Sequence, residues 1–328
     1  MTGRRGFFIG ACGAALLASG TAGAQQPRST IPRIGFLAGR LNPSVAGFDE
    51  GLRELGWIDG RTIRIERRIA DGSNEQSRIM ATELVALGVD AIYVTATQAV
   101  AAVRETTAAT PVVFSMLADP VELGWETNFA RPAGNLTGIA GVATSEIAGK
   151  RIELLLAAVP GARRMGLLYT PRMLTAELAV RGSEAAARML DIQLRVLPIE
   201  RDAAPEPAFA ELSAWGAQAL VVTQSQLLAT QPLQGRIVAL AAAARLPTIY
   251  GEPDWVDFDG LMTYVPDAHD MGRRAAWFMD RILRGAKPAD LPIERPARIQ
   301  LRVNLRAARA IGLALPPSFL ARADEVIE

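Results

Sequence analysis

Cysteine is almost missing from this chain, since Cys12 is the only one among 328 residues. A single thiol cannot form a disulfide within the chain, and thiolate metal centres need several cysteines. Histidine is equally scarce, because His269 is its one example. We expect His269 in the first turn of a helix, exposed to solvent, which argues against histidine-based catalysis. Stability has to come from packing alone.

An excess of charge of either sign is also missing. The chain has 35 basic and 34 acidic residues, a net charge of +1 and a pI of about 7.9. Such a balance produces no net positive electrostatic field that would attract a polyanion, so we expect no nucleic acid partner. Aromatic residues make up 6% and hydrophobic residues 50% of the chain, which is enough for two domains of ordinary size.

Catalytic signatures are thin. The chain has no G-x-S-x-G, no H-E-x-x-H and no G-x-G-x-x-G after a strand, and Lys150 lacks the upstream glycine of a phosphate loop. Glu252 and Asp254 are closely spaced acids, but they flank a proline that can shape a turn. We therefore expect no enzyme, no cofactor and no metal site.

The first 24 residues have the pattern of an export signal. Two arginines precede an apolar run from Gly6 to Ala18, and small residues end in an A-x-A exit site at Ala24. A span needs about 20 apolar residues, so we expect no stable membrane span in the mature protein. TGRRGFFI also resembles a twin-arginine signal, so either export route is open. Cys12 loosely matches a lipoprotein box, but cleavage near Ala24 and a periplasmic location fit better.

From Arg33 onward, short β-rich runs alternate with amphipathic helical stretches, which is typical of a parallel sheet covered on both faces. RIGFLA at 33–38 predicts a buried strand, and VDAIYV at 89–94 predicts another. The alternation starts again after about residue 141. The sequence therefore predicts an α/β protein of two Rossmann-like lobes, each with a parallel sheet.

Ligands of open parallel sheets bind outside the carboxyl ends of the strands. Six loops meet this rule: GRLNPSVAG, TATQ, SMLADPVELG, YTPRMLT, TQSQLLAT and YGEPDWVD. Each also has a structural explanation, since Thr95, Thr97 and Gln98 can cap a helix, Asp119 can form a turn, and Arg40 can be a solvated charge. Polar residues recur at this place in both halves, which favours a ligand site.

Several stretches resemble the ABC-transporter substrate-binding family that includes tryptophan-binding lipoproteins. They are IGFLAGR, GFDEGLRELGW, VVFSMLADPVELG, RPAGNLTGI, KRIELLLAAVP, DGLMTY, ILRGAKPADLPIERP and VNLRAARAIGLALPPSFLARADEVIE, and they cover almost the whole chain after Arg33. The resemblance implies the type I periplasmic-binding fold, in which three chain crossings join two lobes that close on a small solute. We place the crossings near Gly141, Pro253 and Arg295.

These crossings divide the chain into a leader and two lobes. We expect a signal peptide at 1–24, a first lobe of residues 31–141 and 254–294, and a second lobe of residues 142–253 and 295–328.

The resemblance also implies which residues line the cleft. The expected ligand-binding residues are Arg40, Thr95, Thr97, Gln98, Asp119, Tyr169, Thr170, Gln224, Ser225 and Glu252. Relatives often have Tyr-Asn-Pro where this chain has Tyr-Thr-Pro at 169–171, and they often carry an aspartate at the position of Gln224. An amide does not neutralise an amine as an aspartate would. An amino acid, including an aromatic one, and a small organic acid are therefore both open as the solute.

The function that follows is a monomeric periplasmic receptor of an ABC importer, which captures a solute between its lobes and passes it to the transmembrane permease subunits. A periplasmic sensor that presents the solute to a receptor would use the same fold. A secreted enzyme fits less well, and a cytoplasmic regulator would need a DNA-binding segment where the leader stands.

Overall fold

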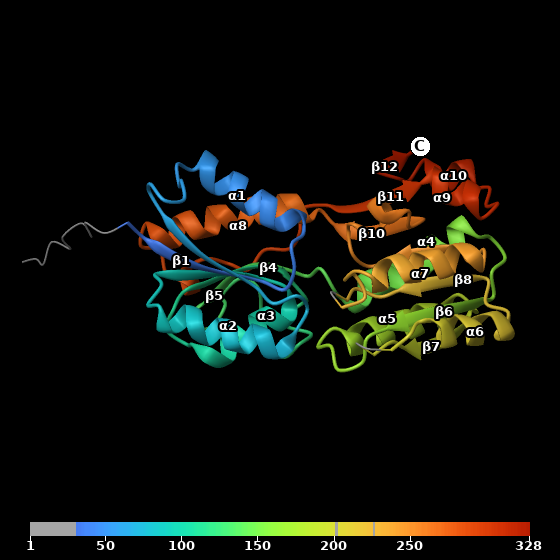
Figure 1. The fold of residues 1–328 in the computed structure, drawn as a ribbon, viewed down its shortest axis with the longest axis horizontal. Coiled ribbons are helices and arrows are strands. Elements are labelled where there is room, and N and C mark those ends of the chain that lie inside the picture. The colour runs from blue at the N-terminus through green and yellow to red at the C-terminus, as the bar shows by residue number, and fades with distance from the viewer. Residues whose placement is uncertain (1–30, 201–202, 226) are drawn as a thin grey trace, which may run out of the picture. The chain divides into compact units, whose positions relative to one another are not determined.

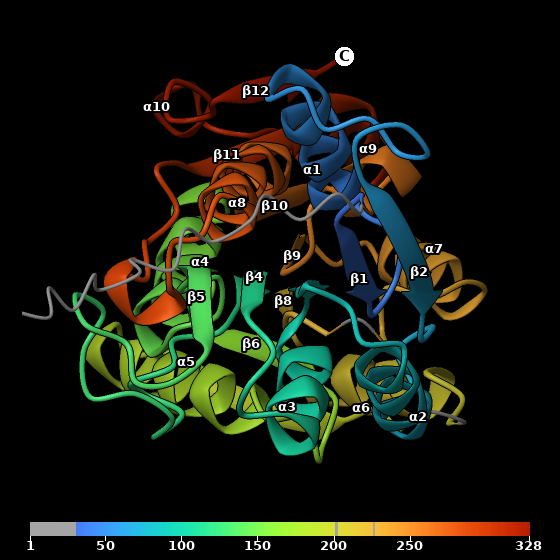
Figure 2. The same cartoon turned by 90° about the vertical axis from the view of Figure 1, so that its left-hand side faces the viewer.

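The computed structural model describes residues 31–200, 203–225 and 227–328. The expected signal peptide, its cleavage site and Cys12 therefore lie outside the described residues. Residues Ile31–Glu328 form one compact unit that contains two β-sheets with helices on both faces (Figures 1 and 2). The predicted α/β class with two sheets is confirmed.

The first sheet has five parallel strands in the order β2-β1-β3-β4-β5. Helices α1 and α8 cover one face, and α2 and α3 cover the other (Figure 1). We call this sheet and its four helices the first lobe. The bounds are β1 Arg33–Ala38, α1 Pro43–Glu54, β2 Arg64–Ile69, α2 Asn74–Ala86, β3 Ala91–Thr95, α3 Thr97–Thr106, β4 Val112–Leu117, β5 Leu136–Ala140 and α8 Ala268–Leu283.

The second sheet has seven strands in the order β12-β11-β10-β9-β8-β6-β7, and only the β10–β11 pair is antiparallel. Together with the helices packed on it, it forms the second lobe. The bounds are α4 Ser145–Ala158, β6 Arg164–Tyr169, α5 Ala176–Met189, β7 Gln193–Pro198, α6 Glu206–Trp215, β8 Ala219–Val222, α7 Leu233–Ala243, β9 Thr248–Tyr250, η1 Trp255–Phe258, β10 Met262–Pro266, β11 Ile299–Asn304, α9 Leu305–Ala310, α10 Pro317–Leu320 and β12 Glu325–Ile327. The short helix η2, Pro288–Asp290, packs near β5 of the first sheet instead.

Three segments carry the chain between the sheets. Residues 141–144 join β5 to α4, Asp267 joins β10 to α8, and 295–298 lead from the β-bridge between Ile139 and Glu294 to β11. The crossing expected near Pro253 is displaced, because β10 pairs with β9 and β11 in the second sheet. Residues 254–266 were therefore assigned to the wrong lobe. The stretch after β9 is the turn around η1, which leads to β10 within the second sheet.

Local sequence explains where the helices start and how closely they pack. Asp267 accepts a hydrogen bond from the backbone N–H of Asp270, and Asn304 caps α9 in the same way. Helices α1 and α8 approach so closely that a Cβ at Gly47 would overlap the carbonyl of His269, and one at Gly272 would overlap that of Ser44. Glycine is required at both contact points.

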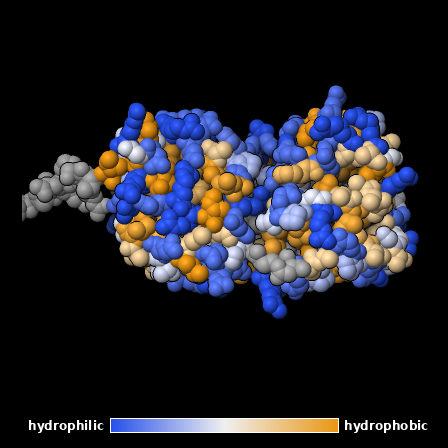
Figure 3. Space-filling model, viewed as in Figure 1, coloured by the Kyte–Doolittle hydropathy of each residue, from blue (hydrophilic) through white to orange (hydrophobic). Residues whose placement is uncertain are grey.

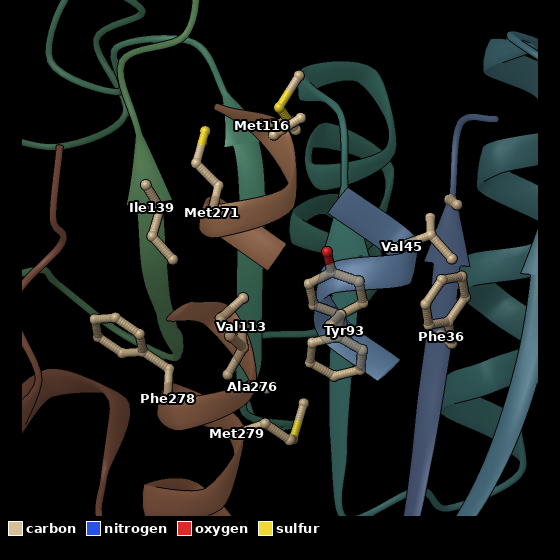
Figure 4. Packing of buried hydrophobic residues seen from close by; sticks show 14 of the residues in the cluster. Phe36, Val45, Tyr93, Val113, Met116, Ile139, Met271, Ala276, Phe278 and Met279 are labelled. Carbon is tan, nitrogen blue, oxygen red and sulfur yellow. The ribbon is translucent and has the colours of Figure 1, made fainter. Parts of the chain in front are cut away.

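Figure 4 shows the core between α8 and the first sheet. Phe36 and Tyr93 come from neighbouring strands, while Met271 and Phe278 come from α8. The ring of Tyr93 stacks on Phe48 of α1 with centroids 3.7 Å apart. This packing holds the carboxyl ends of β1, β3 and β4 in a fixed relation.

The described residues contain no helix long and apolar enough to span a bilayer. On the face drawn in Figure 3, hydrophilic and hydrophobic residues are interspersed.

Candidate solute-binding site

A small cavity lies where the carboxyl ends of the two sheets meet. It has a volume of about 20 Å³, which is room for one water molecule. We call the loops after β1, β3 and β4 the first rim, and the loops after β6, β8 and β9 the second rim. The cavity is lined by Ala96, Thr97, Gln98 and Met116 at the first rim and by Met173, Thr175, Gln224, Ser225 and Glu252 at the second.

Hydroxyl groups that bond to one another support the first rim from below. The Tyr93 Oη lies 2.7 Å from the Ser115 Oγ, and the Ser44 Oγ lies within 3.4 Å of both and 3.3 Å from the Thr95 Oγ1. All four side chains are buried. Burial raises the pKa of the Tyr93 hydroxyl to about 12, so this network is neutral. Thr95 belongs to it and is absent from the cavity lining.

Two residues that line the cavity at the first rim have left-handed backbones. Ala96 has a φ of 91° and Met116 a φ of 56°. Non-glycine residues with such angles are strained, and they collect at functional sites. Thr97 fixes this geometry because its Oγ1 accepts a hydrogen bond from the backbone N–H of Ala118. The backbone N–H groups that begin α3 therefore border the cavity.

Neutral polar groups also meet at the second rim. The Thr170 Oγ1 and Ser225 Oγ are 2.9 Å apart and both residues are buried. The loops after β8 and β9 approach closely, because a Cβ at Gly251 would overlap the backbone N of Gln224. Gln224 Oε1 is buried and accepts no hydrogen bond from any described residue.

Four charged groups surround the second-rim side of the cavity. Arg40 of the first rim donates to both carboxylate oxygens of Asp254, at 2.8 and 3.0 Å, and lies 3.5 Å from Glu252. Arg151 of α4 is buried and donates to the carbonyl oxygens of Tyr264 and Gly251. Glu252 is 2% exposed, and within the described chain its Oε2 accepts no hydrogen bond. The carboxylate thus presents an unused acceptor beside the cavity.

The pKa values follow from this burial. Burial raises the pKa of Glu252 to about 7, although Arg40 and Arg151 oppose the shift. Burial lowers the pKa of Arg151 to about 10, with Glu252 acting against it. Burial also acts to lower the pKa of Arg40, but Glu252 and Asp254 outweigh it and the net direction is upward. A carboxyl that titrates near neutrality at a cleft is characteristic of a functional site.

The structure brings together five of the ten expected residues around the cavity, namely Thr97, Gln98, Gln224, Ser225 and Glu252. Arg40 and Thr170 contact members of this group.

Asp119 and Tyr169 lie elsewhere. One carboxylate oxygen of Asp119 accepts from the backbone N–H groups of Val121 and Glu122, and the other bonds Arg295 at 2.9 Å. Asp119 thus fixes a turn and the third crossing. Tyr169 is half-buried and packs against a hydrophobic core cluster of the second lobe.

Sequence reasoning missed Ala96, Met116, Met173 and Thr175 as cavity-lining residues, and it left out Asp254 as the partner of Arg40. Asp254 could have been found from the sequence, because Glu252 and Asp254 both lie within four positions of the end of β9. The left-handed backbone conformations of Ala96 and Met116 could not be predicted from the residue types at these positions.

Two sheets joined by three crossings, with a polar cavity between their carboxyl ends, define the class of periplasmic binding proteins. A family model described as "ABC transporter substrate binding protein" matches residues 39–327. The chain therefore belongs to the ABC transporter substrate-binding protein family. The description of the family names substrate binding and no catalytic activity.

Similar proteins agree with this assignment. A tyrosine-binding protein of Clostridioides difficile (strain R20291) is 21% identical over 273 residues, which are 83% of this chain and 77% of that protein. A solved ABC domain in complex with L-Trp from Streptococcus pneumonia is 24% identical with a TM-score of 0.82, covering 91% of this chain and 100% of that one. A conserved domain protein from Vibrio cholerae gives a TM-score of 0.83 at 20% identity, with 90% and 100% covered. These structures share the fold.

Proposed function

We propose that this protein is the periplasmic solute receptor of an ABC importer, and that it captures a small solute in the cavity between the two rims. The observation that carries the proposal is the Oε2 of Glu252, which is buried beside a cavity lined by both lobes and has only the 3.5 Å ion pair with Arg40. A buried acceptor without a donor is costly unless a ligand supplies one. Export by the leader and delivery to the transmembrane permease subunits complete the proposed role, with the receptor acting as a monomer.

An α-amino acid is the solute class that fits best. Its ammonium group can donate to Glu252 Oε2, which has only the 3.5 Å ion pair with Arg40, and to Gln224 Oε1, which has no described donor. Its carboxylate can accept from the N–H groups at the start of α3, where the helix dipole favours negative charge. The relatives named above bind tyrosine and tryptophan, which extends this proposal to aromatic amino acids. A small organic acid is the second class, because it could use the α3 end without the ammonium contacts.

Binding requires the lobes to move. A cavity of about 20 Å³ holds a water molecule but no amino acid, so the rims have to separate before the solute enters. The segments 141–144, 267 and 295–298 are the places where rotation can occur. A solute that touches both rims then stabilises a closed form with a wider cavity than this one, because all its contacts exist only there.

A thermal-shift screen of the purified protein tests this function. The panel contains L-tryptophan, L-tyrosine, L-phenylalanine, L-leucine, the aromatic acids that lack the amino group, and dicarboxylates. A ligand at 100 times its Kd stabilises the folded state by about 2.7 kcal/mol, so a true solute raises the melting temperature. We expect a rise with amino acids and little with the acids that lack the amine. Equal shifts with both groups would contradict the amino-acid proposal, and no shift with any compound would contradict the solute-binding role.

Loss of uptake separates transport from sensing. A strain without the gene should fail to take up the solute found in the screen, and the gene supplied in trans should restore uptake. Normal uptake in that strain would contradict the importer role and favour the sensor.

A further inference from the structure

Arg40 connects the two lobes through a partly buried ion pair. It stands after β1 in the first lobe, and its guanidinium donates to both oxygens of Asp254, which follows β9 in the second lobe. The side chain of Arg40 is 10% exposed and that of Asp254 is 18% exposed. Two parallel charge-assisted hydrogen bonds make this the strongest common geometry for an arginine–carboxylate contact.

The pair can exist only while the rims are together. When the lobes separate, both groups become solvated and the directed contact is lost. Surface pairs contribute little to stability, but a pair shielded from water contributes more and leaves an uncompensated charge when one partner is removed. The contact therefore favours the closed arrangement without any help from a solute.

The same guanidinium also faces the cavity-lining carboxylate. Arg40 Nη2 lies 3.5 Å from Glu252 Oε2, while the other Glu252 neighbours in this charge cluster are Asp254 and Arg151. Asp254 repels the negative charge of Glu252, and the two arginines attract it. Arg40 thus holds Glu252 at the cavity while it is itself held by Asp254.

We propose that Arg40 is a positioning residue of the solute site, which closes the cleft through Asp254 before solute binds and keeps Glu252 directed at the cavity. The first half of this inference is independent of the proposed function. The second half rests on it.

Small-angle X-ray scattering of the ligand-free full chain tests the first half. The radius of gyration should increase from the wild type to Arg40→Gln and further to Arg40→Asp, because an aspartate there would repel both acids. Adding Asp254→Arg to Arg40→Asp should bring the radius back toward the wild-type value. Far-ultraviolet circular dichroism must show the wild-type spectrum in each variant. Asp254→Asn supplies a second way to remove the pair should an Arg40 variant fail to fold.

Arg236→Gln is the matched control. Arg236 also bonds both oxygens of a carboxylate, Glu206, at 2.7 Å, but both residues lie on helices of the second lobe and are about half exposed. Its radius of gyration should equal that of the wild type. Unchanged radii in Arg40→Asp and Asp254→Asn would overturn the inference, and so would a wild-type curve typical of separated lobes.

Calorimetry tests the second half, with L-tryptophan and L-tyrosine as probes. Arg40→Gln should raise Kd by about 5- to 150-fold, because the loss of the group that directs Glu252 at the cavity outweighs the easier opening of the cleft. Part of the loss should return in the Arg40→Asp, Asp254→Arg double variant. If neither probe binds the wild type, the extension of the proposed function to aromatic amino acids is wrong, while the scattering result still decides the closure. If a probe binds Arg40→Gln with wild-type affinity, the positioning role is wrong.

Discussion

The two rims that meet at the cavity differ in how their polar groups are used. Beneath the first rim, the hydroxyls of Ser44, Tyr93, Thr95 and Ser115 lie within hydrogen-bond distance of one another and are neutral. The second rim carries Gln224, whose Oε1 accepts no hydrogen bond from a described residue, and Glu252, whose Oε2 has only the 3.5 Å ion pair with Arg40. A satisfied network favours one rigid arrangement, whereas unsatisfied acceptors favour a partner from outside. We therefore expect the hydroxyl network beneath the first rim to act as a rigid frame, and the acceptors of the second rim to bind the solute's ammonium group.

Removal of the carboxylate at the second rim should have the largest effect. Glu252→Ala deletes the acceptor and leaves Arg151 and Arg40 with one balancing charge fewer. We expect a loss of about 3 kcal/mol of binding free energy, roughly a hundredfold in Kd, by calorimetry with the solute found in the screen. Glu211→Ala is the control, because Glu211 pairs with Arg195 at the surface and should leave Kd unchanged. Similar Kd values for Glu252→Ala and the wild type would contradict the claim that the second rim binds the solute through Glu252.

The charge of Glu252 should also make stability depend on pH. Its pKa is about 7 in the folded protein and 4.5 in the reference state, so the folded chain holds the proton more tightly. The free energy of unfolding should therefore fall as pH rises from about 4.5 through about 7, by up to about 3 kcal/mol from this group. Urea denaturation of the wild type and Glu252→Gln across this range measures the difference. Parallel pH profiles of the two proteins would show that Glu252 does not titrate there.

Loss of the second free acceptor should have a smaller effect. Gln224→Leu removes one hydrogen bond from the solute's ammonium group, worth about 1.5 kcal/mol, so Kd should rise roughly tenfold. Gln234 offers a matched control, because it is buried on α7 with a free Nε2 and is absent from the cavity lining. Gln234→Leu should bind the solute like the wild type. An equal loss in both variants would point to a general effect on the second lobe.

A change in the first rim should affect stability and not affinity. Tyr93→Phe removes the hydroxyl that lies 2.7 Å from Ser115. The free energy of unfolding should fall by about 1 kcal/mol in urea, since one buried hydrogen bond is lost. The Kd for the solute should stay within twofold of the wild type. A tenfold change in Kd would mean that the first rim also contacts the solute through this network.

Much of the fold could be predicted from the sequence, because it follows from local patterns. The alternation of strands and helices gave both sheets, and the capping residues Asp267 and Asn304 marked two helix starts. The rule on carboxyl strand ends also led to Gln98, Gln224 and Glu252, since it depends only on where strands stop.

Other features depend on partners far away in the sequence. Arg40 bonds Asp254 across 214 positions, and Asp119 bonds Arg295 across 176. No local pattern in the sequence shows that the residues of either pair are partners. The second crossing was misplaced for a similar reason, because the pairing of β10 with β11 joins distant segments.

Hydrogen exchange with and without the solute from the screen tests the central claim most directly. If one solute is shared by the two rims, binding should slow exchange together in residues 95–98 and 116–118 of the first rim and in 223–225 and 251–254 of the second. Slower exchange in one rim alone, or only at sites outside both, would contradict the claim that the solute closes them on itself.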